Sequence, residues 1–572
     1  MSDVAVRRRI TAGAVLLSLA LAGLGWRLAF LHLGAHEKMR RRVEQRRTFE
    51  HKILAGRGAI YDCAGPRNVL ACNLSVKDVC ADPHRIVGKN AVMETAMGLA
   101  ECLDLPTDEV FLRINRPERR FEYIKRHVHE KRVRTLENLG LPGIFYRDVI
   151  IRNYPHKEFM CHILGFVNFE GVGSAGIEQE LDSLLRGRPG FMKGRVNALR
   201  EEWYWARIRY EAADKGADVC LNIDENVQYF VEKALDRLME EHRAKGAWAI
   251  VQKVKTGEIL AMASRPGFDP NRFRTVGTAA RLNRATGFVY EPGSTFKVIA
   301  VSAALNEGII TPDTVIHCEN GAWRYGGRIL RDYHPYGELT VADIIKKSSN
   351  IGTAKIALKL GNRLFEQYLK AFGVGNTLGI DLPGEERGIL HERRKWSKIC
   401  PTRIAIGQAV SVTALQVLGI HSAIANNGYL MRPYVINSVT DNDGTVLRKN
   451  EPEVLARPIT RETARTMRKL LGRVTESGGT GRRAAIKGYR IAGKTGTAEK
   501  PVDGGYSSTR HVASFVGFLP ADDPEVAMIV VADEPQPVHT GGVVAAPAFR
   551  RIADRVIRYL EITPSPNRVA MH

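Results

Sequence analysis

The sequence predicts an α+β protein that is anchored in a membrane by one amino-terminal helix and carries an antiparallel sheet covered by helices. Three observations support this class. An uncharged run extends from Ile10 to Trp26 and continues, after Arg27, as far as Leu33. Strand-like segments lie between an amphipathic helix near residue 224 and a final helix near the carboxyl terminus. Helical segments interrupt these strands, which favours an antiparallel sheet over a repeating strand-helix fold.

The apolar run is long enough to cross a bilayer as a helix, with Arg27 near the interface. A cleaved signal peptide is one alternative, since Ala20-Leu21-Ala22 resembles a cleavage site, but the run exceeds the usual apolar length of such peptides. A buried helix of a soluble protein is the other. We therefore expect residues 1–9 to form a cytoplasmic tail and residues 10–33 to form an uncleaved transmembrane anchor.

Basic residues after this anchor outnumber the three arginines before it. They are Lys38, Arg40, Arg41, Arg42, Arg46, Arg47 and Lys52. Charge alone would keep this side of the anchor in the cytoplasm, although long domains cross membranes despite such charge. The chemistry of the carboxy-terminal part must therefore decide the orientation.

The net charge of +22 raises the possibility of nucleic-acid binding. No nucleic-acid-binding motif accompanies it, so we expect a solvated basic surface near anionic headgroups or wall polymers and no nucleic acid partner. The eight cysteines form no C-x-x-C pair, and His127 and His129 have no further ligands at a metal-binding spacing. We expect no metal and no cofactor, while disulfide pairing stays open.

The carboxy-terminal elements follow from periodicity and turn residues. Asp224 is a plausible N-cap for an amphipathic helix that runs to about His242. Residues 247–264 read as two strands joined by a tight turn at Thr256-Gly257. Further strands are expected within residues 488–500, 513–520 and 525–534, followed by a helix at about 546–559.

Ser294 and Lys297 stand three residues apart at the start of an apolar segment. Pro292 and Gly293 break the preceding chain, and the residues that follow suit a helix buried on most faces. Positions i and i+3 share a helix face, so the amine would lie near the hydroxyl. Burial lowers the pKa of a lysine, which makes it available as a base for the serine. A helix start with an ordinary surface lysine is the alternative reading of this pair.

Two later segments are candidates to complete such a site. Ser348 and Asn350 open another amphipathic helix, where N-capping is the alternative explanation. Residues 494–497, Lys-Thr-Gly-Thr, follow an apolar strand and leave the backbone open for an extended substrate. The same Lys-Thr-Gly tripeptide occurs at residues 255–257, where a hairpin turn explains its glycine, so we expect that copy to be structural.

The motifs S-x-x-K, S-x-N and K-T-G together resemble those of penicillin-binding proteins and serine β-lactamases. The middle motif reads Ser348-Ser349-Asn350 instead of S-D-N, so no aspartate role carries over. Other segments are similar to the monofunctional class B penicillin-binding proteins: RGAIYD (57–62), GVGSAGIEQELDSLLRGRPG (171–190), TGEILAMASRPGFDPN (256–271) and GGVVAAPAF (541–549).

This resemblance implies a domain plan. Residues 34–220 would form a periplasmic pedestal of the dimerisation type. Residues 221–562 would form a penicillin-binding transpeptidase domain, with an antiparallel sheet covered by helices and an all-helical insert. Residues 563–572 are expected to be a flexible tail.

The resemblance also implies a serine-type D-Ala-D-Ala transpeptidase that crosslinks peptidoglycan stem peptides and is acylated by β-lactam antibiotics. Ser294 would attack the penultimate D-alanine carbonyl while Lys297 takes its proton. Ser348 and Lys494 would relay protons or polarise the leaving group, and Asn350 would hold the substrate amide. The substrate-binding segment would be Thr495, Gly496 and Thr497, with Lys494, Thr495 and Thr497 on the terminal carboxylate and the backbone amides of Ser294 and Thr497 as oxyanion hole.

Three other functions would require sequence features that differ from these. A β-lactamase would often use a glutamate in an E-x-x-L-N loop, and no such string follows Ser294. A non-catalytic β-lactam receptor would need a sizeable signalling module, whereas nine residues precede the span. A bifunctional synthase would need a glycosyltransferase motif, and none is found in residues 34–220. An elongation-type class B enzyme remains the nearest alternative.

The string KSSNIGTAKIALKLG (347–361), with GIDLPGE (379–385) and RKWS (394–397), resembles the division-specific type more closely. A septal enzyme would work on lipid II-derived strands with a polytopic septal glycosyltransferase and other divisome proteins. Because the substrate lies outside the cytoplasmic membrane, we expect a single-pass inner-membrane protein with a cytoplasmic amino terminus and a periplasmic catalytic domain.

Overall fold

The computed structural model describes residues 3–195, 208–502 and 505–564. The chain divides into two compact units, one of residues 1–56 with 187–215 and one of residues 57–186 with 216–572. Residues 565–572 of the predicted flexible tail lie outside the described residues.

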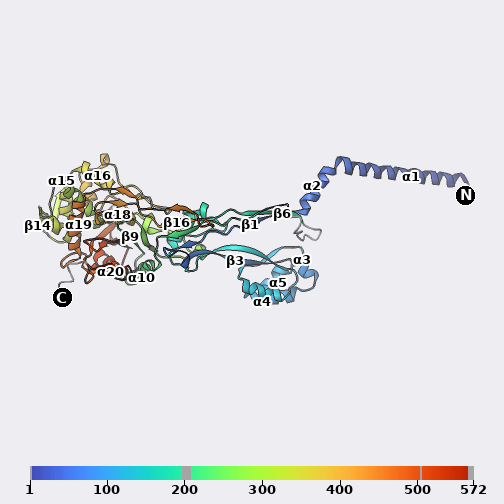
Figure 1. Ribbon diagram of the computed structural model, residues 1–572, viewed down its shortest axis with the longest axis horizontal. Helices are drawn as coiled ribbons and strands as arrows, with labels where there is room; N and C mark the ends of the chain where they lie inside the picture. The colour runs from blue at the N-terminus through green and yellow to red at the C-terminus, as the bar shows by residue number, and fades with distance from the viewer. Residues whose placement is uncertain (1–2, 196–207, 503–504, 565–572) are drawn as a thin grey trace. The chain divides into compact units, whose positions relative to one another are not determined.

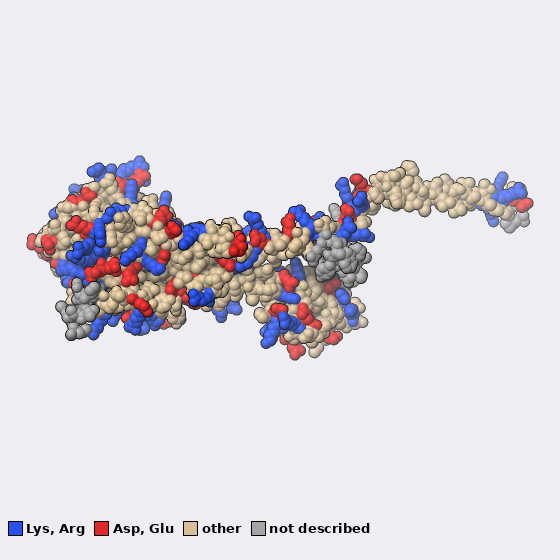
Figure 2. Space-filling model, in the orientation of Figure 1, with Lys and Arg blue, Asp and Glu red and all other residues tan. Residues whose placement is uncertain are grey.

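The first unit begins with a long apolar helix, α1 (Asp3–Ala29), which continues as a short π-helix (Phe30–Gly34). None of its residues is buried within the protein, and its length and apolar composition suffice to cross a membrane. Between its charged first turns and Arg27 in its last turn, α1 carries no charged side chain, and Figure 2 shows this apolar stretch. Helix α2 (His36–Arg47) follows it and leads into an antiparallel sheet of β1 (Thr48–Ile53), β6 (Gly190–Arg195) and β7 (Arg209–Glu211).

The second unit contains a seven-stranded sheet whose order is β17-β16-β8-β2-β3-β4, with β5 also paired to β3. Its strands are β2 (Ile60–Tyr61), β3 (Val69–Ala81), β4 (Glu122–Val128), β5 (Ile144–Asn153), β8 (Asp218–Leu221), β16 (Ile436–Thr440) and β17 (Val446–Lys449). Four helices form a small core with β3 and β4: α3 (Pro83–Gly88), α4 (Val92–Leu103), α5 (Thr107–Ile114) and α6 (Glu130–Asn138). Segments more than 200 residues apart therefore share one sheet.

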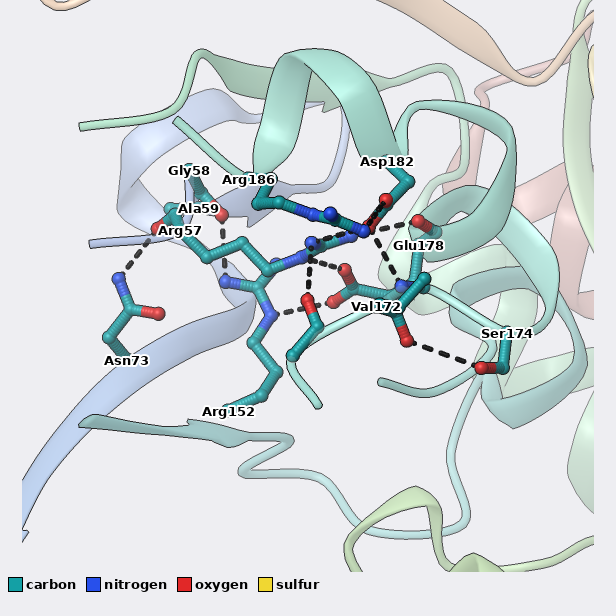
Figure 3. Close-up of polar contacts among 12 residues, drawn as sticks. Arg57, Gly58, Ala59, Asn73, Arg152, Val172, Ser174, Glu178, Asp182 and Arg186 are labelled. Atoms are coloured by element: carbon teal, nitrogen blue, oxygen red, sulfur yellow. Dashed lines mark hydrogen bonds and ion pairs between the residues drawn. The ribbon is translucent and has the colours of Figure 1, made fainter. Parts of the chain in front are cut away.

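A buried charge cluster ties the RGAIYD segment to the GIEQE segment. Glu178 is fully buried and accepts hydrogen bonds from Arg57 at 2.5 Å and from Arg152 at 2.6 Å (Figure 3). Arg57 also donates to Asp182 at 2.7 Å, and the Tyr154 hydroxyl reaches Glu178 at 3.2 Å. A buried carboxylate is tolerated because two guanidinium groups neutralise it and satisfy both of its oxygens.

The carboxy-terminal half of this unit is built on an antiparallel five-stranded sheet of order β10-β9-β21-β20-β19. The strands are β9 (Gly246–Lys253), β10 (Ile259–Arg265), β19 (Ala492–Val502), β20 (Gly505–Leu519) and β21 (Val526–Asp533). These match the strands expected from sequence, including the hairpin at Thr256-Gly257. Gly257 has φ +87°, and a Cβ there would lie 2.3 Å from a backbone oxygen of Arg432, so glycine is required at this turn.

Helices cover both faces of this sheet. On one face, α10 (Glu225–His242) and α20 (Gly541–Tyr559) share a core with β9, β20 and β21 (Figure 1). Asp224 caps α10 as expected, accepting from the amides of Asn226 and Val227. On the other face lies α18 (Ala414–Ala425), which is buried along its whole length. The predicted α+β architecture, with helices on an antiparallel sheet, is therefore confirmed.

The last helix begins at Gly541, five residues before the predicted start. Glycine is a poor helix former, so sequence patterns do not mark Gly541 and Gly542 as the start of a helix. In the structure Pro547 lies inside α20. The first turn at Gly541-Gly542 packs against β19, where a Cβ on Gly541 would lie 2.2 Å from the backbone oxygens of Gly496 and Ser514.

The insert between β10 and β19 is mainly helical. Its helices of seven or more residues are α13 (Lys297–Asn306), α14 (Val341–Lys347), α15 (Asn350–Leu360), α16 (Asn362–Ala371), α18 and α19 (Arg461–Gly472). It departs from the predicted all-helical insert by three short ladders and by β16 and β17, which join the seven-stranded sheet. The ladders pair β11 (Val315–His317) with β14 (Glu338–Thr340), β12 (Ala322–Tyr325) with β13 (Arg328–Arg331), and β15 (Leu430–Met431) with β18 (Val454–Ala456). Strands this short do not produce a clear period-2 pattern.

Charged side chains of both signs are interspersed over the visible face of this half (Figure 2). The net positive charge is thus not gathered there into one continuous basic surface.

Candidate active site

Ser294 lies in a 3-10 turn (Gly293–Phe296) immediately before α13. Gly293 has φ +56°, and a Cβ there would lie 2.7 Å from the backbone oxygen of Thr497. Only glycine allows the turn to approach β19 this closely. The Thr295 hydroxyl donates to the backbone oxygen of Pro292 at 2.8 Å and stabilises the turn. Ser294 is consequently held beside the Lys-Thr-Gly-Thr strand from which it is separated by some 200 residues.

Lys297 is fully buried at the start of α13. Its Nζ donates to the backbone oxygen of Ser348 at 2.6 Å and to the Ser348 hydroxyl at 3.2 Å. Burial lowers the pKa of Lys297 to about 7, while the nearby carboxylate of Asp332 acts in the opposite direction. The amine can therefore lose its proton near neutral pH, and its hydrogen bonds are directed to Ser348.

Ser348 occupies the junction between α14 and α15 with φ +61°, a left-handed conformation that turns the chain sharply. Its hydroxyl accepts a second hydrogen bond from Lys494 Nζ at 2.8 Å. Lys494 is also fully buried, and burial together with neighbouring Lys297 holds its pKa well below the ordinary value. Two lysines from distant segments thus converge on one hydroxyl.

Asp332, which the sequence reasoning missed, lies in the turn after β13 and binds the start of α15. Its carboxylate accepts from the Ser349 hydroxyl at 2.6 Å and from the backbone amides of Asn350 at 2.5 Å and Ile351 at 3.0 Å. A carboxylate at a helix amino terminus accepts hydrogen bonds from the free amides there and interacts favourably with the positive end of the helix dipole. No local pattern reveals it, because Asp332 is 17 residues before Ser349 and meets it only in three dimensions.

Asn350 is oriented by a second contact from the same turn. Its Nδ2 donates to the backbone oxygen of Arg331 at 2.8 Å, and the Ser349 hydroxyl caps α15 by accepting from the amide of Gly352 at 3.0 Å. N-capping, the alternative explanation for this motif, is thus real, but it is performed by the middle serine. Ser348 and Asn350, on either side of Ser349, do not cap the helix, and both line the cavity described below.

The Lys-Thr-Gly-Thr segment lies on β19, at the edge of the sheet. The Thr495 hydroxyl donates to the Thr480 hydroxyl at 2.9 Å, and the Thr497 hydroxyl accepts from the amide of Gly541 at 3.1 Å. A Cβ on Gly496 would lie 2.3 Å from the Ser514 hydroxyl and 3.0 Å from the backbone oxygen of Pro292. Gly496 therefore permits the contact between β19 and the Ser294 turn.

A cavity of about 830 Å³ joins these segments. Ser294, Ser348, Asn350, Thr495 and Thr497 all line it, whereas Gly496 does not. Its wall also includes Tyr333, which is 87% exposed, and the stacked rings of His511 and His539, whose centroids are 3.9 Å apart. Of the residues proposed from sequence, those with exposed atoms share one cavity, and the two lysines are buried behind Ser348.

The earlier Lys-Thr-Gly copy takes no part in this arrangement. Lys255 lies at the β9–β10 hairpin and pairs with Asp523 at 3.5 Å. Within residues 3–195, 208–502 and 505–564, no group of three or more His, Cys, Asp or Glu side chains is arranged to hold a metal ion.

Two family models match the sequence. Residues 52–221 match the penicillin-binding protein dimerisation domain, and residues 247–554 match the penicillin binding protein transpeptidase domain. The second match contains all the residues that line the cavity.

Similar proteins extend over nearly the whole chain. Peptidoglycan D,D-transpeptidase FtsI of Escherichia coli is 32% identical over 98% of this chain and 92% of its own length. Stage V sporulation protein D of Bacillus subtilis is 31% identical over 100% of this chain and 88% of its own length. Among solved structures, a peptidoglycan synthetase from Bifidobacterium adolescentis has a TM-score of 0.72 at 26% identity, covering 91% of this chain and 98% of that one. Penicillin binding protein 3 of Mycobacterium tuberculosis in complex with ampicillin has a TM-score of 0.70 at 26% identity, covering 90% and 98%.

Proposed function

Because this chain belongs to the penicillin-binding protein transpeptidase family, we propose that Ser294 is the nucleophile of an FtsI-type peptidoglycan D,D-transpeptidase that crosslinks stem peptides during septal wall synthesis. The proposal rests on one observation above all: the Ser348 hydroxyl accepts from both Lys297 and Lys494, at the wall of a cavity that Ser294, Asn350 and Thr495 also line. Similarity to FtsI favours the septal role, and the sporulation protein of Bacillus subtilis is also similar.

In the acylation step, Ser294 Oγ attacks the carbonyl carbon of the penultimate D-alanine, and Lys297 takes the hydroxyl proton. The backbone amides of Ser294 and Thr497 stabilise the oxyanion. The C–N bond then breaks, and the leaving D-alanine nitrogen receives a proton through Ser348 from the lysine pair. Lys494, Thr495 and Thr497 bind the terminal carboxylate, Gly496 keeps the strand open between them, and Asn350 holds the substrate amide.

In the second step, an amine from a neighbouring stem peptide attacks the ester carbonyl. A new amide bond forms, the bond between that carbon and Ser294 Oγ breaks, and the amine proton returns to the serine. A β-lactam antibiotic acylates Ser294 in the same way: the lactam C–N bond breaks and the ring opens. The leaving nitrogen stays covalently attached to the acyl group, so it does not depart to make room for an acceptor.

The location of the protein and its expected partners follow from this substrate. Helix α1 anchors the chain in the cytoplasmic membrane, and residues 34–220 (pedestal) and 221–562 (transpeptidase domain) lie on the outer, periplasmic side, where peptidoglycan is found. Lipid II-derived strands, a polytopic septal glycosyltransferase and other divisome proteins are the expected partners.

The direct test uses full-length protein in membranes, labelled with fluorescent penicillin. Ser294→Ala abolishes labelling at unchanged abundance. Ser302→Ala preserves it, because Ser302 is a buried serine of the following helix α13 whose hydroxyl donates to the backbone oxygen of Ile299. Mass spectrometry of the labelled wild type locates the adduct on the peptide that carries Ser294. Labelling of Ser294→Ala, or an adduct on another peptide, would refute the assignment.

A further inference from the structure

One side of the cavity carries positive charge that the mechanism above does not use. Lys347, Arg482 and Arg483 line it, and Glu499 is the one acid among the described residues of the wall. Lys347 is half-buried and the two arginines are exposed. Within the described part of the chain, their side chains take part in no hydrogen bond or ion pair. Other basic residues nearby are paired, such as Arg473, which contacts Asp343 at 3.0 Å.

The three cations come from two segments that meet at the Thr495 side of the cavity. Lys347 is the last residue of α14, directly before Ser348. Arg482 and Arg483 begin a 3-10 turn after the loop that carries Thr480, and Thr480 bonds to Thr495. The loop and α14 are in close approach, because a Cβ on Gly478 would lie 3.6 Å from Lys347 Nζ. The charges therefore adjoin the place proposed for the D-alanine leaving group.

Neighbouring cations without partners repel one another, and an anion bound between them relieves this repulsion. Arginine in particular matches the planar geometry of a carboxylate. In the proposed mechanism the terminal D-alanine carboxylate is already bound by Lys494, Thr495 and Thr497. The charge of Lys347, Arg482 and Arg483 is thus available for a second anionic group.

Attack of an amine on the acyl-enzyme is the reverse of the step in which a peptide acylates the enzyme. The attacking amine must therefore enter at the place from which the leaving amine departed. We infer that Lys347, Arg482 and Arg483 form an acceptor subsite that binds a free carboxylate on the stem peptide whose amine resolves the acyl-enzyme. This inference rests on the proposed function, and it assigns the acceptor class: an amine-bearing peptide with a carboxylate close to that amine. The new amide forms as the ester bond to Ser294 breaks, and binding at the subsite positions the amine for this attack.

The test separates the two halves of the reaction in full-length enzyme. A thioester analogue of the donor peptide acylates the enzyme, and transfer is measured to two acceptors: a stem peptide whose attacking amine adjoins a free carboxylate, and the same peptide with that carboxylate amidated. Arg482→Gln/Arg483→Gln is compared with Arg461→Gln/Arg465→Gln, two exposed arginines of α19 that do not line the cavity. Lys347→Gln provides a second, independent variant.

We expect the wild type to favour the carboxylate acceptor. In Arg482→Gln/Arg483→Gln, the KM for this acceptor rises about tenfold, as expected for the loss of one charge-assisted carboxylate contact. The amidated acceptor, penicillin acylation and the α19 variant are unaffected. An unchanged acceptor preference, or a loss confined to donor acylation, overturns the subsite. If wild-type Ser294 is not acylated at all, the proposed function itself fails, which is a different result.

Discussion

The carboxylate of Asp332 accepts a 2.6 Å hydrogen bond from the hydroxyl of Ser349, the middle residue of the Ser348-Ser349-Asn350 motif. The family pattern S-D-N has an aspartate at this middle position, and here a serine occupies it. An aspartate from a separate turn supplies the negative charge at the start of α15 and also influences Lys297. Asp332 acts through these neighbours, so it is a positioning residue.

Asp332→Asn should therefore alter the pH dependence of acylation. Acylation by penicillin requires neutral Lys297, so its rate rises with pH through the pKa of about 7. The Asp332 carboxylate stabilises the ammonium form, and removing its charge lowers the pKa of Lys297 and moves this rise to lower pH. Lys494 faces Lys297 from β19, and the proximity of Lys297 helps to lower the pKa of Lys494. The plateau rate falls about tenfold, because hydrogen bonds to a charged group contribute about 1.5–3 kcal/mol.

Rates of penicillin acylation measured from pH 5 to 9 check this shift. Asp343→Asn on the neighbouring helix α14 is the control, since Asp343 contacts Thr340 and Arg473 and not the serine motif. A lower plateau with an unmoved pH profile would mean that Asp332 has only a structural role.

Lys494→Ala should slow acylation by about 100-fold, the effect of removing one preorganised donor from a site of this kind. The variant loses the amine proposed to bind the substrate carboxylate, which is also the donor that holds the Ser348 hydroxyl at 2.8 Å. Stopped-flow acylation by a chromogenic cephalosporin measures the rate. Lys487→Ala, an exposed lysine before β19, should behave as the wild type. A wild-type rate in Lys494→Ala would exclude both roles.

Glu178→Ala should destabilise the protein by about 3–5 kcal/mol, because it leaves the guanidinium groups of Arg57 and Arg152 buried without their shared carboxylate. Urea unfolding followed by circular dichroism measures the change in free energy of unfolding. The matched control is Glu130→Ala, which removes an exposed ion pair with Arg134 and should leave the free energy of unfolding nearly unchanged, because solvent screens such pairs. Equal effects of the two substitutions would show that the buried cluster adds no stability.

Gly541→Ala should lower both thermal stability and penicillin acylation, since its Cβ would lie 2.2 Å from two backbone oxygens and force α20 away from β19. The Thr497 hydroxyl would lose its contact with the amide of residue 541. Gly277→Ala, where a Cβ meets nothing within 4 Å, is the control for both readouts. A Gly541→Ala protein that melts and acylates like the wild type would show that this contact is dispensable.

Sequence patterns alone were enough to predict the apolar amino-terminal helix, the main helices and strands of the central sheet, and the family, because apolar periodicity and the S-x-x-K, S-x-N and K-T-G strings are local properties of the chain. They also predicted a buried lysine beside Ser294. They missed the start of α20 at Gly541, where two consecutive glycines open the helix in close contact with β19. Only the tertiary structure revealed Asp332, the convergence of two lysines on Ser348 and the cationic wall of the cavity. Such contacts depend on how distant segments are packed together, and no pattern within a short window of sequence records that packing.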